Sequence, residues 1–167
     1  MTGSKDEILD KVYELAFKYE ASYGCCPQCV LRAVGEVLNL KIDEAFKSSH
    51  GLAGGTALSG NGTCGALVGG IMAICSVHGR GLEDMGKGRF LKSYSLAKRL
   101  YDKFVQEYGS CICKDVQKKI FGRSFDLWDP EDFKKFEEMG GHRDKCPSVT
   151  GKVARWATEI LLNESNV

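Results

Sequence analysis

One segment constrains the fold more than any other, because it is uncharged and changes from glycine-rich to apolar at a single cysteine. Residues 51–62 hold five glycines and no charged side chain, and Cys64 then opens an apolar run that ends near Val77. This run of about 14 residues is short of the roughly 20 that a membrane-spanning helix needs. We therefore expect a buried central helix over residues 66–75, enclosed by the rest of the chain.

The glycines on the two sides of Cys64 predict different things. Those in residues 51–62 leave the backbone free to adopt angles that other residues avoid, so we expect this loop to line a site. It is not a phosphate-binding loop, because Gly-Lys-Ser/Thr and a preceding strand are both missing. Gly65, Gly69 and Gly70 let another backbone approach the helix closely. That contact would lie within one chain or between the subunits of a homo-oligomer.

The other elements are predicted from helical spacing. Apolar side chains recur three and four residues apart, and no stretch alternates as a strand does. We predict amphipathic helices over residues 6–19, 26–40, 43–50, 90–108, 115–121, 130–139 and 147–163. The inner face of the fourth is expected to be aromatic, with Phe90, Tyr94, Ala97, Tyr101, Phe104 and Tyr108. The expected class is all-α: a compact multi-helix bundle, one domain over residues 1–167, with the glycine-rich loop leading into the central helix.

Four of the predicted helix starts carry a thiol. The cysteines there are Cys26, Cys29, Cys64, Cys111, Cys113 and Cys146. Cys26 and Cys146 each precede a proline, which is favoured at the first position of a helix. The free amide groups of a helix start favour negative charge and lower the pKa of a thiol, so these cysteines are placed for chemistry. Cys75 lies inside the apolar helix, where we expect a buried filler.

Eight cysteines is a high count for a soluble chain. Residues 1–7 contain no apolar stretch that could be a secretion signal, so we expect a cytoplasmic protein. Disulfides are normally reduced in that compartment, and clustered cysteines there are more often metal ligands or redox-active groups. Lys plus Arg is 23 against 22 for Asp plus Glu, which gives no electrostatic case for nucleic acid or an anionic membrane. We set both aside and expect an unidentified redox partner.

The sequence around these cysteines resembles the family named after its pattern C_GCAxxG_C_C. Members of that family are described as redox-active and are in some cases joined to split-Soret cytochromes. The resemblance covers about residues 26–162. Its landmarks are Cys29-Val30-Leu31-Arg32-Ala33, Thr63-Cys64-Gly65-Ala66-Leu67-Val68-Gly69-Gly70, Tyr108-Gly109-Ser110 before Cys113, and Cys146 before the last helix. Carried over position by position, the family cysteines are Cys29, Cys64, Cys113 and Cys146.

The chain departs from the family pattern in two respects. Its central motif reads Thr-Cys-Gly-Ala in place of Gly-Cys-Ala, so the loop beside Cys64 need not follow the family geometry. It also has extra thiols at Cys25, Cys26, Cys75 and Cys111. No haem is expected, because Val30 follows Cys29 where a Cys-x-x-Cys-His attachment motif needs histidine.

The sequence leaves three uses of the thiols open. The four family cysteines suit a zinc ion or an iron–sulfur cluster, although their spacing fits no standard signature of either. Cys26-Pro27-Gln28-Cys29 has the form of an exchange motif in which Cys26 and Cys29 are the catalytic pair, but no strand precedes it. The alternative function is a helical interaction or scaffold protein with buried, inert cysteines. Nothing in the spacing distinguishes one histidine among His50, His78 and His142.

Overall fold

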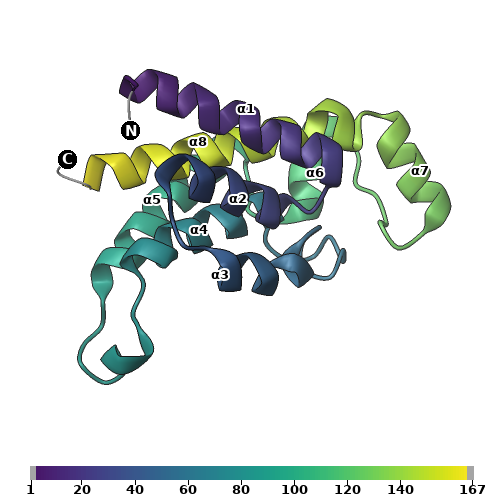
Figure 1. The fold of residues 1–167 in the computed structure, drawn as a ribbon. Helices are drawn as coiled ribbons and strands as arrows, with labels where there is room; N and C mark the ends of the chain where they lie inside the picture. The colour runs from purple at the N-terminus through teal and green to yellow at the C-terminus, as the bar shows by residue number, and fades with distance from the viewer. Residues whose placement is uncertain (1–2, 165–167) are drawn as a thin grey trace.

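The computed structural model describes residues 3–164, which form helices joined by loops and contain no strand (Figure 1). The α-helices are α1 (Lys5–Tyr23), α2 (Cys26–Leu38), α3 (Asp43–Ser48), α4 (Gly65–His78), α5 (Leu91–Tyr108), α6 (Cys113–Phe121), α7 (Pro130–Glu138) and α8 (Cys146–Glu164). Shorter helical turns are η1 (His50–Leu52), η2 (Leu82–Asp84) and η3 (Gly141–Lys145). The predicted all-α class is confirmed. Within residues 3–164, no helix is both long and apolar enough to cross a membrane.

The core lies between α1, α2, α4, α5 and α8. Helices α1 and α8 run side by side, α2 packs against both, and α4 contacts α2, α5 and α8 (Figure 1). Helix α4 is therefore enclosed by other helices, as its apolar sequence predicts. A Cβ on Gly69 would lie 2.5 Å from the Pro27 carbonyl oxygen, and one on Gly70 would lie 2.7 Å from a methyl group of Leu100. These two glycines thus serve close contacts within the chain.

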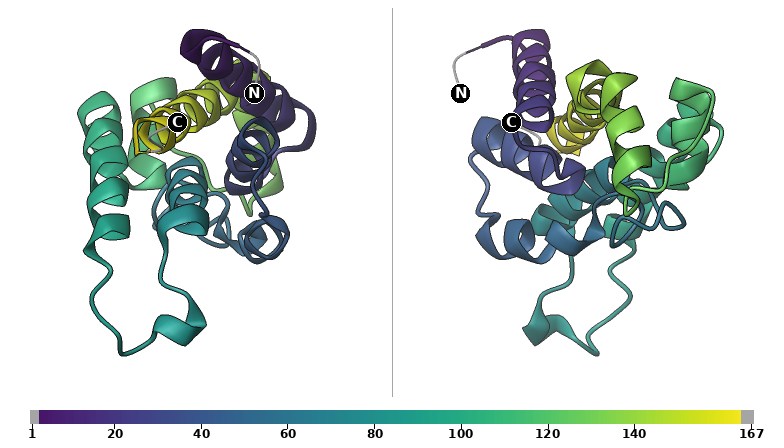
Figure 2. Two further views of the ribbon diagram at one scale, coloured as in Figure 1. Left: turned by 60° about the vertical axis from the view of Figure 1, so that its left-hand side comes forward. Right: turned by 90° about the vertical axis from the view of Figure 1, so that its right-hand side faces the viewer.

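Local signals in the sequence explain where several helices begin. Ser4 and Glu7 form a capping box at α1, in which each side chain accepts a hydrogen bond from the other's backbone amide. Asp129 caps α7 by accepting a hydrogen bond from the Asp132 amide. The connection between α4 and α5, residues 79–90, projects away from the helical body (Figure 2).

Two predictions of burial are wrong. Tyr94 and Tyr101 of α5 are exposed by 69% and 38%, and the buried side chains of this helix are Ser93, Leu96, Leu100, Phe104 and Tyr108. An amphipathic helix has one inner stripe, and in α5 it is the stripe of Leu96, Leu100 and Phe104 that packs against the core. Cys75, predicted to be buried, is exposed because the last turn of α4 extends beyond the helices that enclose the rest of it.

Candidate functional site

Helices α2, α4, α6 and α8 each begin at a cysteine, which confirms the prediction of a thiol at each of these starts. Cys26, Cys113 and Cys146 are the first residues of α2, α6 and α8, and Cys64 is the N-cap residue of α4. The side chains of all four line one pocket, which we call the thiol pocket. Thiols from four separate parts of the chain, with Cys25 next to Cys26, therefore border one pocket.

Backbone hydrogen bonds join the segments that carry Cys64 and Cys113. The Cys64 amide donates to the Cys111 carbonyl oxygen at 2.8 Å, and the Cys113 amide donates to the Gly62 carbonyl oxygen at 3.0 Å. The loop that precedes Cys64 lines the thiol pocket through Ala53, Gly54 and Leu58, so the glycine-rich loop borders a pocket.

Two glycines let this backbone approach the thiols closely. A Cβ on Gly55 would lie 2.7 Å from the Cβ of Cys113, and a Cβ on Gly65 would lie 2.5 Å from the Cys26 sulfur. Neither position has room for a side chain, so glycine there is a condition for the meeting of the thiols.

The thiol pocket contains a cavity of about 80 Å³ with a mainly apolar lining. Apart from the thiols, its walls include Val116, Ile120, Leu127, Phe133, Phe136 and Val149. Protein interiors are close-packed, so a partly open space of this size beside four thiols suits a small bound group.

Burial raises the pKa of all four thiols, which reverses the direction expected from their helix starts. The pKa of Cys64 rises to about 11, although the amides of Ala66 and Leu67 act to lower it. The pKa values of Cys26, Cys113 and Cys146 also rise, with burial as the largest cause and, for Cys26 and Cys146, the charge of Glu20 as the next. Loss of water outweighs the amide groups, so without a bound cation these thiols stay neutral near pH 7.

Glu20 of α1 places a carboxyl group in the wall of the thiol pocket. Glu20 is 2% exposed, and its Oε2 atom accepts no hydrogen bond from an N–H or O–H group within residues 3–164. Its Oε1 atom lies 3.9 Å from Nε2 of His142, whose Nδ1 atom is paired with Glu137. Burial raises the pKa of Glu20 to about 7. A carboxylate at this depth is costly even with His142 and the Cys29 thiol beside it, so Glu20 and the four thiols form a donor set suited to a cationic group.

Sequence reasoning did not single out Glu20, and it gave His142 no preference over the other histidines. The signal for Glu20 was its spacing, since it follows Val12 and Ala16 in steps of four along the buried face of α1. A carboxylate at such a position is unusual. His142 lines the thiol pocket, whereas His50 lines a different pocket and His78 ends α4.

Cys29 lies beside a different pocket from the other three cysteines carried over from the family. Its thiol donates to the Gly24 carbonyl oxygen at 2.9 Å, and it lines a surface pocket together with Cys25, Arg32 and His50. Cys25 and Cys26, two of the thiols that the family pattern lacks, line the thiol pocket. The assignment of Cys29 as a ligand, and of Cys26 with Cys29 as a catalytic pair, stays a prediction.

The thiols are not arranged around a single point. Within residues 3–164, no group of three or more His, Cys, Asp or Glu side chains is placed so that it could hold a metal ion. A zinc ion needs four sulfurs at about 2.3 Å from one centre. An iron–sulfur cluster is wider than a single ion and keeps its ligand sulfurs farther apart.

Comparison with known proteins gives one match, which agrees with the resemblance seen in the sequence. A family model described as "Putative redox-active protein (C_GCAxxG_C_C)" matches residues 24–160. That range includes the starts of α2, α4, α6 and α8, and therefore the whole set of thiols that line the pocket. No curated protein and no solved structure matches the chain.

Proposed function

We propose that this chain, which belongs to the C_GCAxxG_C_C family of redox-active proteins, holds an iron–sulfur cluster in the thiol pocket and transfers electrons through it. The observation that carries the proposal is the meeting of Cys26, Cys64, Cys113 and Cys146 from four helix starts around one cavity. Four cysteine thiolates are the usual ligands of such a cluster, which supplies a one-electron couple when bound.

Zinc is the weaker candidate for the same ligands. A zinc ion has no redox chemistry, whereas the family is described as redox-active. A single ion would also leave much of the 80 Å³ cavity unfilled and would need the four sulfurs drawn together around it.

Thiol–disulfide exchange is less well supported than a cluster. The attacking group in exchange is a thiolate, and reactive thiols have a lowered pKa. Burial raises the pKa of both Cys26 and Cys29, the pair expected for this chemistry. In a cluster, iron provides the positive charge that lets buried thiolates form, and the Ala66 and Leu67 amides would stabilise the sulfur of Cys64.

A scaffold with inert cysteines explains less of the site. Inert thiols act as small apolar side chains and close-pack like any others. The space between these thiols is a cost that a close-packed structural core would avoid.

Anaerobic reconstitution with iron and sulfide tests the proposal. We expect bound iron and sulfide, with visible absorption, in the wild-type chain, and a loss of most of both in Cys64→Ser and Cys113→Ser. Cys75→Ser is the matched control, because Cys75 is exposed and lies away from the pocket. Comparing Cys26→Ser with Cys29→Ser identifies the remaining ligand, and we expect only the former to lose iron. A wild-type chain without iron, or full iron content in Cys64→Ser, would overturn the proposal.

A further inference from the structure

The connection between α4 and α5, residues 79–90, is an arm that extends away from the helical body (Figure 2). Its far end is formed by the short turn η2 (Leu82–Asp84) and by Met85. Leu82 is 84% exposed and Met85 is 64% exposed. Exposed apolar side chains that lie together among polar residues are typical of an interaction surface. The far end of the arm is therefore suited to contact another surface.

A surface pocket, which we call the base pocket, lies at the other end of the arm, where α4 ends and α5 begins. Its apolar walls come from Ile71, Phe90 and Tyr94, and the Cys75 thiol lines it as well. Its volume of about 390 Å³ is within the range of pockets that bury a bound group, roughly 300–1,000 Å³. The chain thus has an apolar projection at one end of the arm and a partly apolar hollow at the other.

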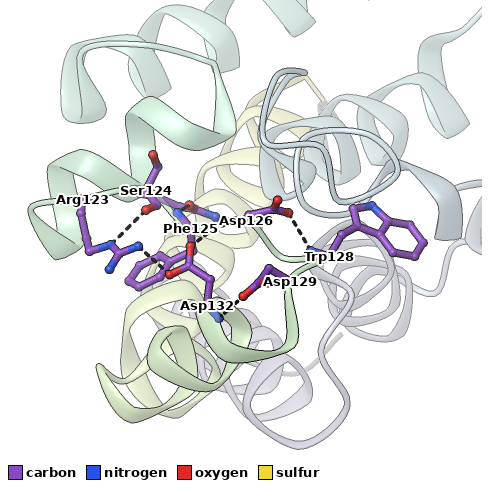
Figure 3. Close-up of polar contacts among 8 residues, drawn as sticks. Arg123, Ser124, Phe125, Asp126, Trp128, Asp129 and Asp132 are labelled. Atoms are coloured by element: carbon purple, nitrogen blue, oxygen red, sulfur yellow. Dashed lines mark hydrogen bonds and ion pairs between the residues drawn. The ribbon is translucent and has the colours of Figure 1, made fainter.

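Two arginines give the base pocket a positive charge. Arg80 and Arg89 line it, and no acidic residue of the described chain does. Elsewhere on the surface, the guanidinium group of Arg123 lies 2.6 Å from a carboxylate oxygen of Asp132 (Figure 3). Arg80 and Arg89 have no such ion pair within the part of the chain that the structure describes. The base pocket therefore offers two guanidinium groups to a carboxylate from outside.

The far end of the arm carries a carboxylate that is also unpaired. Asp84 lies 3.4 Å from the Lys87 amine, so this pair adds little net charge. Glu83 is exposed and forms no ion pair with any described residue. Arginine binds a carboxylate through two parallel hydrogen bonds, which fixes direction as well as charge. The two ends of the arm are thus complementary in charge as well as in shape.

A two-fold axis that crosses the arm at its middle places the far end of each arm beside the base of the other. The same contact then forms twice, as in any isologous dimer. We propose that two copies of this chain form such a dimer, in which Leu82 and Met85 of each copy enter the base pocket of the other and Glu83 pairs with Arg80 and Arg89 there. The dimer needs no cluster, because the base pocket and the thiol pocket share no described residue.

Sedimentation equilibrium of the full chain in reducing buffer measures the dissociation constant of the dimer. We expect Leu82→Asp to raise this constant at least tenfold, because a charged group replaces an apolar one in the base pocket. Arg80→Glu with Arg89→Glu should also raise it, and adding Glu83→Arg to that pair should lower it again, because the charges are complementary once more. Tyr23→Asp, which changes a side chain that is 73% exposed on α1, is the matched control and should leave it unchanged.

A cross-link locates the contact. In Met85→Cys, the new thiol and Cys75 of the second copy should form a disulfide with diamide, which accepts the two protons and two electrons that the thiols lose. We expect a covalent dimer that is absent in Met85→Cys with Cys75→Ser and in Tyr23→Cys. In the wild type, Cys75 is exposed in the dilute monomer, and its alkylation should slow as protein concentration rises.

Two results would overturn the proposal. One is a wild-type chain that stays monomeric at millimolar concentration. The other is a dimer whose dissociation constant is the same in Leu82→Asp and Tyr23→Asp, because its copies would then meet through another face.

Discussion

Replacing Glu20 by glutamine in the metal-free protein should change how stability depends on pH. Burial raises the pKa of Glu20 from 4.5 to about 7, so the folded state holds the proton more tightly than the unfolded state does. The stability that comes from the neutral carboxyl is complete below about pH 4.5 and is lost as the pH rises through 7. At 1.36 kcal/mol for each pKa unit, this loss amounts to about 3 kcal/mol.

Glutamine does not titrate, so the variant lacks this loss. We expect the free energy of unfolding of Glu20→Gln, relative to the wild type, to increase by about 3 kcal/mol between pH 4 and pH 8. Urea unfolding of both chains at each pH gives the difference directly, and contributions from groups that the substitution leaves alone cancel. Glu14→Gln, at an exposed position of the same helix, should change stability by less than about 0.5 kcal/mol. Parallel curves for wild type and Glu20→Gln would refute the account of a buried carboxyl with a raised pKa.

Two further predictions concern packing and thiol access. Gly69→Ala should lower the free energy of unfolding by about 1–3 kcal/mol in urea unfolding, because the new Cβ would meet the Pro27 backbone. Gly51→Ala is the control, since nothing lies within 4 Å of its new Cβ. Equal unfolding midpoints for the two variants would contradict the close contact of α2 and α4. In the metal-free protein at pH 8, peptide mapping should find exposed Cys75 alkylated at least tenfold faster than Cys64, whose pKa is about 11, and similar rates would count against the burial of the thiol pocket.

The fold class and the helix starts could be predicted because their signals are local. Proline after Cys26 and after Cys146 favours a helix start at those points, and the glycines predict the loop before Cys64. The burial of α5 could not be predicted from spacing alone. Its tyrosines and leucines both recur at helical intervals, and only packing against α4 and α8 decides which set faces inward.

The site was less accessible to sequence reasoning than the fold. Cys26 and Cys29 lie within one turn of α2, so a pattern cannot say which of them lines the thiol pocket. Their direction depends on how the chain leaves α1, where Gly24 and Cys25 both adopt φ values of 65°. The sign of the thiol pKa shifts was wrong for a related reason, since the amides of a helix start are visible in the sequence and the loss of water around Cys64 is not.

The order of the thiols along the chain has a consequence for biosynthesis. Cys26 opens the second helix, whereas Cys146 opens the last, and α8 packs against α1, α2 and α4. A nascent chain that has not yet emerged past residue 146 lacks both a sulfur and a wall of the site. A cofactor of the proposed kind would therefore enter only after α8 has emerged and packed against the other helices.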